Sequence, residues 1–130
     1  MESSQFKNGK IHIWKERFAI VKSKRPLPNS FAVIQDKNEI TCIIDQNKVK
    51  SVDILAIEKE WRIITFDIVM PFGLVGFLAE ISSALAKEKI SIFAISSFST
   101  DHILVKENDL QKALKVLEKL GFIISPRPPA

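Results

Sequence analysis

The chain has 130 residues, of which 46% are hydrophobic and 26% are charged, and its formal net charge is +4. A chain of this length buries roughly two thirds of the surface that its unfolded form exposes, which is enough for a hydrophobic core. The basic excess is mild, with eleven Lys/Arg against eight Asp/Glu in residues 1–60 and eight against seven in residues 61–130, and it argues against nucleic-acid binding.

The first half of the chain begins with a strand-like stretch. Residues 10–21 carry apolar side chains in strand-like order, and the charged residues 15–17 interrupt them. A loop rich in charge and proline is predicted over residues 22–30. We expect the basic side chains of that loop to be solvated: Lys22, Lys24 and Arg25.

A hairpin is predicted next. The apolar runs 31–35 and 40–44 flank Asp-Lys-Asn-Glu at residues 36–39, a sequence typical of turns. Cys42 is the one cysteine, which excludes an internal disulfide, and its apolar neighbours predict a buried thiol. This half lacks the apolar periodicity that would predict a long helix.

The second half has clearer periodicity. Residues 64–69 alternate with the period of two that is typical of a strand. Apolar residues at offsets of three, four and seven then predict an amphipathic helix over residues 74–85. The β-branched and aromatic run 90–98, a turn at residues 99–101 and the apolar run 103–105 predict an antiparallel hairpin.

A second helix and a last strand complete the pattern. Another apolar stripe predicts a helix over residues 110–120, with Asn108 or Asp109 as its cap and Gly121 as its stop. Residues 122–124 can add a strand. The order strand, helix, strand, strand, helix, strand predicts an α+β, ferredoxin-like βαββαβ fold with both helices on one face of an antiparallel sheet.

The second half also resembles a known family. Its helices and hairpin read GLVGFLAEISSALAKEKISIFAISSFSTDHILVKENDLQKALKVLEKLG, and the most specific part is ISIFAISSFSTDHILVKENDL. This pattern resembles an ACT domain, in particular the short paired ACT proteins related to the ACT repeats of aspartate kinases and to the cytosolic arginine sensors of animals. The sequence LPNSFAVIQDKNEITCIID, at residues 27–45, is similar to the first repeat of that subfamily.

The resemblance implies two packed ACT modules. Because an ACT module is about half the length of this chain, an atypical module would span residues 8–58 and a regular one residues 60–125. The atypical module would have lost or shortened a helix. ACT modules usually work side by side, so the resemblance also implies a homodimer.

The resemblance further implies a binding site for a free amino acid. In related modules the loop before the first helix and the facing end of the second strand, usually from a neighbouring module, enclose the ligand. A helix start suits the ligand's carboxylate, because its leading amides are unpaired. The implied residues are Phe72, Gly73, Leu74, Val75 and Gly76 from the loop and Ser97, Phe98 and Asp101 from the strand end.

Asp101 would accept hydrogen bonds from the ligand's ammonium group or basic side chain, whereas Ser97 and Phe98 would contribute mainly backbone groups. The alternative is that Asp101 caps the backbone of its own turn. Leu74 stands where the arginine sensors carry an acidic side chain, so arginine itself is in doubt as the ligand. Asp67, on the preceding strand, could face the same pocket or, more simply, solvent.

The sequence favours regulation over catalysis. His12 and His102 lie in separate halves without metal-ligand spacing, and no glycine loop matches a phosphate-binding motif. We therefore predict a protein that is not an enzyme and has no catalytic residue, metal site or cofactor. The leading function is an amino-acid sensor. The alternative is an ACT protein that acts only through protein contacts, with a copy of itself or a client protein.

The location follows from what the chain lacks. The N-terminus MESSQFKNGK has no apolar signal region, and no apolar stretch is long enough to span a membrane. We expect a cytoplasmic protein with no membrane attachment, and a disordered tail after residue 125.

Overall fold

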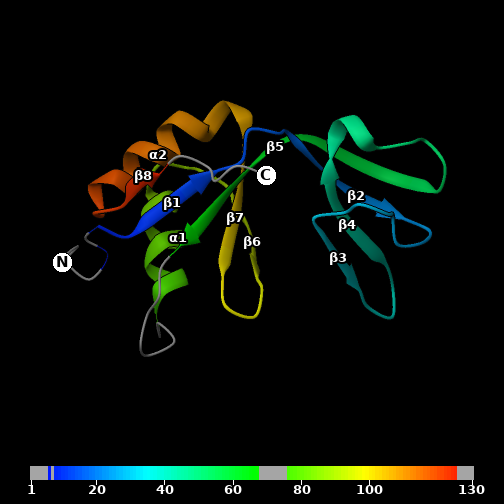
Figure 1. The fold of residues 1–130 in the computed structure, drawn as a ribbon, viewed down its shortest axis with the longest axis horizontal. Coiled ribbons are helices and arrows are strands. Elements are labelled where there is room, and N and C mark those ends of the chain that lie inside the picture. The colour runs from blue at the N-terminus through cyan, green and yellow to red at the C-terminus, as the bar shows by residue number, and fades with distance from the viewer. Residues whose placement is uncertain (1–5, 7, 68–75, 126–130) are drawn as a thin grey trace. The chain divides into compact units, whose positions relative to one another are not determined.

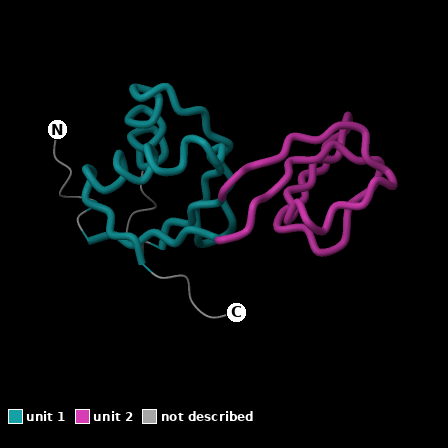
Figure 2. The backbone as a smooth tube through the Cα atoms, turned by 90° about the horizontal axis from the view of Figure 1, so that it is seen from above, with its two compact units in different colours: residues 1–14, 63–130 teal, residues 15–62 magenta. Residues whose placement is uncertain are grey.

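The computed structural model describes residues 6, 8–67 and 76–125. The chain divides into two compact units, unit 1 with residues 1–14 and 63–130 and unit 2 with residues 15–62 (Figure 2). Strand β5 (Ile54–Asp67) contributes its first part to unit 2 and its second part to unit 1.

Unit 1 is a sheet covered by two helices on one face (Figure 1). Its strands lie in the order β8-β1-β5-β7-β6, with β1 antiparallel to β5, β8 parallel to β1 and β6 antiparallel to β7. The elements besides β5 are β1 (Lys10–Ile13), α1 (Phe77–Lys87), β6 (Phe93–Ser96), β7 (Asp101–Lys106), the 3-10 turn η3 (Glu107–Asp109), α2 (Leu110–Lys119) and β8 (Ile123–Ser125).

The core of unit 1 lies between this sheet and the helices. Alternate residues of the strands, such as Ile64 and Phe66, meet the apolar stripes of α1 and α2 in one buried cluster. Aromatic rings fill one part of it: the Phe66 ring centroid lies 5.2 Å from that of Phe77 and 5.3 Å from that of Phe122. Burying each such side chain stabilises the fold by roughly 1.5–3 kcal/mol. The predicted α+β, ferredoxin-like fold is confirmed.

Some local predictions need adjustment. Asp109 lies at the start of α2, but its side chain makes no capping hydrogen bond, because η3 leads the chain into the helix. Gly121 has φ 110°, the left-handed conformation of a glycine stop, as predicted. Strand β6 is shorter than the predicted run 90–98, since Ile90 turns into the core after Lys89 adopts φ 62°.

Unit 2 is a four-stranded antiparallel sheet. Its strands lie in the order β3-β4-β2-β5, and every residue from 15 to 62 is described, with no α-helix among them. Besides the first part of β5, the elements are β2 (Phe18–Ser23), β3 (Ala32–Gln35), β4 (Ile40–Asp45) and the 3-10 turn η2 (Gln46–Lys48). The lack of a long helix in this half agrees with the prediction.

The predicted hairpin of unit 2 is confirmed. β3 pairs antiparallel with β4, and Asp36 Oδ1 closes the turn by accepting the N–H groups of Asn38 at 2.8 Å and Glu39 at 2.9 Å. Cys42 is fully buried and lies 3.6 Å from Ser23 Oγ, so the prediction of a buried thiol is also confirmed.

The spatial units differ from the ranges expected for the two modules. β1 belongs to unit 1, where it lies between β5 and β8 and adds a strand to the βαββαβ pattern. β5 continues through residues 58–60 without a linker, and Glu60 has φ 69° within it. The assignment of residues 8–58 and 60–125 to two ACT modules stays a prediction.

Candidate functional site

The predicted ligand loop is described only at its end. Phe72, Gly73, Leu74 and Val75 lie outside the described residues, whereas Gly76 is the N-cap of α1. Gly76 has φ 86°, and a Cβ atom placed there would have no neighbour within 4 Å among the described residues. Within the described residues no side chain caps this helix start, and the first turn is closed by Glu80 N–H donating to Gly76 O at 2.9 Å.

The other half of the predicted site is the turn between β6 and β7. Ser97 donates its backbone N–H to Thr100 O at 2.8 Å and its hydroxyl to the same oxygen at 3.0 Å. These bonds fix the turn and occupy the Ser97 donors. Phe98 is fully exposed at the tip.

Asp101 begins β7, and its carboxylate accepts a hydrogen bond from Ser96 Oγ across the hairpin. Within the described part of the chain it accepts no backbone N–H, so the turn-capping alternative is not what the structure shows. One oxygen therefore has a partner, and the carboxylate, which is partly exposed, has further acceptor capacity for a ligand.

A hydrogen bond joins the two strands that frame the site. Thr65 Oγ1, near the end of β5, lies 2.8 Å from His102 Nδ1 at the start of β7. Trp14 Nε1–H donates to the same hydroxyl at 2.8 Å. The end of β5, which leads toward the predicted loop, therefore lies beside the strand end that carries Asp101. In Figure 1 the start of α1 and the β6–β7 turn lie at the same end of unit 1.

His102 is held in its neutral form by these surroundings. Burial lowers the pKa of His102 below its ordinary value of 6.5, and the nearby Asp101 carboxylate opposes this shift without cancelling it. The Thr65 hydroxyl accepts from Trp14 and is positioned to donate its own proton to Nδ1. The side chains of Asp101 and His102 have different hydrogen-bond partners, Ser96 for Asp101 and Thr65 for His102.

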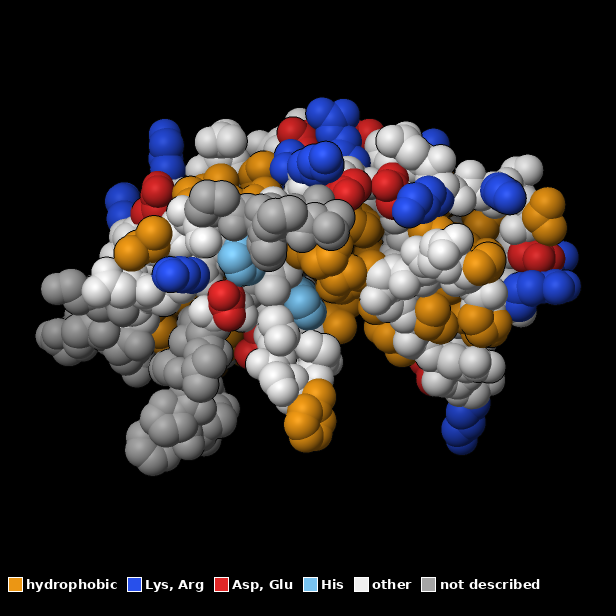
Figure 3. Space-filling view, viewed as in Figure 1, with side chains coloured by type: hydrophobic (Ala, Val, Ile, Leu, Met, Phe, Trp, Pro, Cys, Tyr) orange, Lys and Arg blue, Asp and Glu red, His pale blue; other side chains and the backbone are white. Residues whose placement is uncertain are grey.

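A second histidine lies on the same sheet. His12 Nε2 is 3.3 Å from Asp67 Oδ2, and the Asp67 side chain is 57% exposed, which agrees with the simpler prediction that it faces solvent. Both histidines are visible on one face of the molecule, in pale blue (Figure 3). No local pattern in the sequence indicates either contact, because the partners are 55 residues apart for His12 and 37 for His102.

The basic loop of unit 2 is largely paired with acids. Lys22 Nζ lies 3.8 Å from Glu39 Oε1, and Arg25 Nε lies 3.0 Å from Asp53 Oδ2. This pairing supports a solvated loop rather than a basic patch. Among the described residues, no group of three His, Cys, Asp or Glu could hold a metal ion. Neither helix in the described ranges is long and apolar enough to cross a membrane.

Two helices on one face of a sheet in which β1 pairs antiparallel with β5, β6 pairs antiparallel with β7, and β8 is parallel to β1 define a ferredoxin-like α+β domain. Residues 56–119 match the sequence model of the ACT domain family. A comparison with curated proteins found no match.

Solved structures share the fold over most of the chain. Protein Atu0741 from Agobacterium tumefaciens is similar with a TM-score of 0.80 and 22% identity, over 94% of this chain and 96% of that one. The ligand-free regulatory subunit of aspartate kinase from Thermus thermophilus is similar with a TM-score of 0.63 and 10% identity, over 86% and 95%. Escherichia coli aspartokinase III in complex with aspartate and ADP has a TM-score of 0.63 and 10% identity, over 85% of this chain and 32% of that one.

Proposed function

We propose that this protein is a regulatory sensor that binds a free amino acid at an interface between ACT modules. The observation that carries the proposal is the start of α1 at Gly76, which no side chain of the described residues caps and which lies at the same end of unit 1 as the β6–β7 turn that leads into Asp101 (Figure 1). An amino acid has the complementary groups, since its carboxylate suits the unpaired amides of a helix start and its ammonium suits a carboxylate.

The proposal assigns the ligand to the loop and strand end named from the sequence: Phe72, Gly73, Leu74, Val75, Gly76, Ser97, Phe98 and Asp101. It includes the two tandem modules, the relation to the arginine sensors, a homodimer, a cytoplasmic location and the absence of catalysis. The aspartate kinase structures support it, because one is a regulatory subunit and another is a complex with aspartate. A ligand that bridges two modules shifts their equilibrium only as far as it binds one arrangement better.

The second candidate is an ACT protein that acts through protein contacts alone. It is favoured by the fully exposed Phe98 and by β3, which is the edge strand of unit 2 and exposes Val33 and Ile34. Edge strands of this kind pair readily with another chain. The client would then be recognised by exposed apolar groups rather than through a bound metabolite.

Thermal melting of the chain against each of the twenty amino acids separates the two candidates. A ligand at about 100 times its Kd adds about 2.7 kcal/mol of stability, which raises Tm by several degrees for a chain of this size. We expect one amino acid to raise Tm, and the shift to disappear in Asp101→Ala.

Ser96→Ala is the matched control, because it removes the hydrogen bond to Asp101 but keeps the carboxylate. It should retain most of the ligand-induced shift. A panel without any shift, or a shift that survives Asp101→Ala, would contradict the proposed site.

A further inference from the structure

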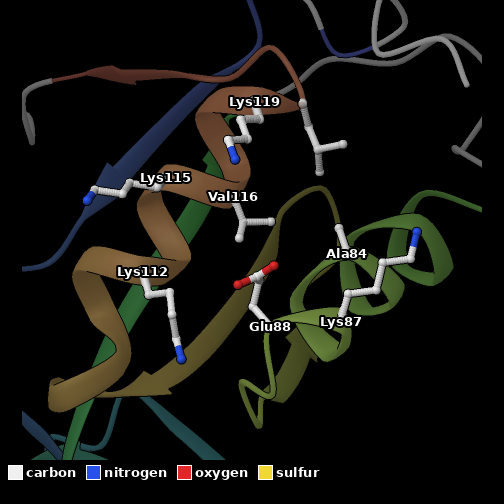
Figure 4. Close-up of a pocket in the computed structure, with 8 residues that line it drawn as sticks. Ala84, Lys87, Glu88, Lys112, Lys115, Val116 and Lys119 are labelled. Atoms are coloured by element: carbon white, nitrogen blue, oxygen red, sulfur yellow. The ribbon is translucent and has the colours of Figure 1, made fainter.

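The outer surface of the two helices of unit 1 carries a groove that the amino-acid site does not use. Its cavity has a volume of about 320 Å³ and lies between the last turns of α1 and the length of α2 (Figure 4). The floor is apolar and is formed by Ala84, Val116 and Leu120, which are all half-buried.

Lysines dominate the rim of this groove. Lys87 comes from α1, and Lys112, Lys115 and Lys119 come from α2, whereas Glu88 is the one acidic residue of the lining. The four lysines are exposed, and none of them makes an ion pair within the described part of the chain. The groove thus combines an apolar floor with a net positive rim.

The positions of these lysines work against the stability of α2. Lys112, Lys115 and Lys119 are three, four and seven residues apart, so they lie along one side of the helix. Like charges at such spacings repel one another and destabilise a helix. Glu118, next to Lys119 in sequence, makes no ion pair with them among the described residues. An acidic partner would relieve this repulsion.

The arrangement in space indicates the shape of that partner. In Figure 4 the ammonium groups of Lys87, Lys112, Lys115 and Lys119 do not converge on one point, and those of Lys87 and Lys115 point outward on opposite sides of the groove. Seven residues of α2 extend about 10 Å, which is roughly two turns of a second helix. A single compact anion cannot contact charges spread in this way, and it gains nothing from an apolar floor.

We propose that this groove binds an acidic amphipathic helix of another protein. Apolar side chains of that helix would lie on Ala84, Val116 and Leu120, and its carboxylates would face the lysine rim. This is the helix-in-groove mode of recognition, in which apolar anchors at helical spacing give affinity and charge complementarity gives specificity.

The probe for this proposal is a fluorescein-labelled helical peptide of about 15 residues, with leucines along one face and glutamates along the others. Its binding is measured by fluorescence anisotropy. We expect the wild-type protein to bind it, and the triple variant Lys112→Glu, Lys115→Glu, Lys119→Glu to lose about tenfold or more in affinity.

The matched control reverses three exposed lysines of unit 2 instead: Lys15→Glu, Lys24→Glu and Lys37→Glu. It has the same net charge as the groove variant, and we expect it to keep nearly the wild-type affinity. A milder set, Lys112→Gln, Lys115→Gln and Lys119→Gln, tests the groove if charge reversal disturbs the fold.

Three results would overturn the proposal. The first is an equal loss of affinity in the groove variant and the control, which would indicate nonspecific charge attraction. The second is equal binding of the same peptide with Gln in place of every Glu. The third is displacement of the peptide by inorganic tripolyphosphate at an equal concentration, which would identify a compact-anion site.

Discussion

The two units bury their apolar residues in different ways. Unit 1 places its strands under two helices, and fifteen buried residues form one cluster there. In unit 2 the described residues include a smaller cluster of Ala19, Val21, Cys42 and Ile44, against which partly buried side chains from loops and strand ends pack, such as Leu27 and Val49. A helix is a rigid cover, whereas a loop can move. A sheet with buried apolar side chains therefore has a deep core in unit 1 and a shallow core in unit 2.

The largest expected effect comes from replacing one buried isoleucine in each unit with alanine. The two substitutions together test the difference between the two cores. Ile64 lies in the core of unit 1 with no exposed surface, and Ile44 lies in the core of unit 2 with 2% exposed. We expect Ile64→Ala to lower the free energy of unfolding by roughly 4 kcal/mol and Ile44→Ala by roughly 2 kcal/mol, because loops relax around a cavity better than packed helices do.

Urea denaturation of both variants measures these losses. If Ile44→Ala costs as much as Ile64→Ala, the loops of unit 2 are as rigid as the helices of unit 1. The different covers of the two cores, helices in unit 1 and loops in unit 2, would then not explain how each core responds to a cavity. The same residues would still be buried.

The next largest effect concerns buried hydroxyl groups. Thr65 bonds both Trp14 Nε1 and His102 Nδ1 at 2.8 Å, whereas Ser23 donates to one carbonyl, Arg25 O, at 2.7 Å. Thr65→Val keeps the side-chain shape but leaves two polar groups without this partner, and we expect a loss of about 2 kcal/mol.

Ser23→Ala is the counterpart in unit 2 and should cost about 1 kcal/mol, since it removes the bond to Arg25 O and a longer, weaker contact of 3.6 Å with Cys42 Sγ. Chemical denaturation again measures both changes. A smaller cost for Thr65→Val than for Ser23→Ala would mean that water replaces the Thr65 hydroxyl, and that this side of unit 1 is more open than the structure indicates.

Gly76 allows a smaller and more local test. Its φ of 86° lies in the left-handed region, and the space beside it is open, so Gly76→Ala introduces backbone strain without a steric clash. We expect a loss of about 1 kcal/mol in stability, measured from Tm. Gly76→Asn should cost less, because asparagine tolerates this conformation better.

The helix start at Gly76 also links stability to the proposed ligand. If the amino acid binds the leading amides of α1, the ligand should raise the Tm of Gly76→Ala by less than it raises the Tm of the wild type. Backbone strain alone would not account for the whole of this difference. Equal shifts in the variant and the wild type would place the ligand away from this helix start.

The sequence predicted the local elements well, because their signals lie within a few residues. The helical stripes, the hairpin closed by Asp36 and the glycine stop at Gly121 all depend on neighbours in sequence. The insertion of β1 between β5 and β8 was not predicted. A strand's periodicity shows which face is buried, but it does not show which strand lies beside it.

The same limit applies to the candidate site. Ser96 and Asp101 are five residues apart in one hairpin, so the predicted hairpin could also have indicated their pairing. Thr65 and His102 come from two strands and Trp14 directly follows a third, and nothing local marks the three as partners. The choice of loop and strand end came from the ACT resemblance, because polar residues in turns are too common to indicate a ligand by themselves.

The smallest expected effect is a pH dependence that unit 1 has and unit 2 lacks, since both histidines lie outside residues 15–62. Burial beside Thr65 holds the pKa of His102 below 6.5, against the opposing effect of the Asp101 carboxylate. The folded state therefore binds fewer protons than the unfolded state between the lowered pKa and 6.5. The free energy of unfolding should fall as the pH is lowered through this window. Well above pH 6.5, His102 should have no effect on it.

Denaturation curves of the wild type and His102→Gln at a series of pH values isolate this effect from that of the carboxylates, which both proteins share. Below pH 6.5, the wild type should lose more stability than His102→Gln as the pH is lowered. If the difference is constant with pH, the imidazole is solvated when protonated. The hydrogen bond from Thr65 would then open at little cost, and the contact that joins β5 to β7 would contribute less to the geometry of the site than its distance suggests.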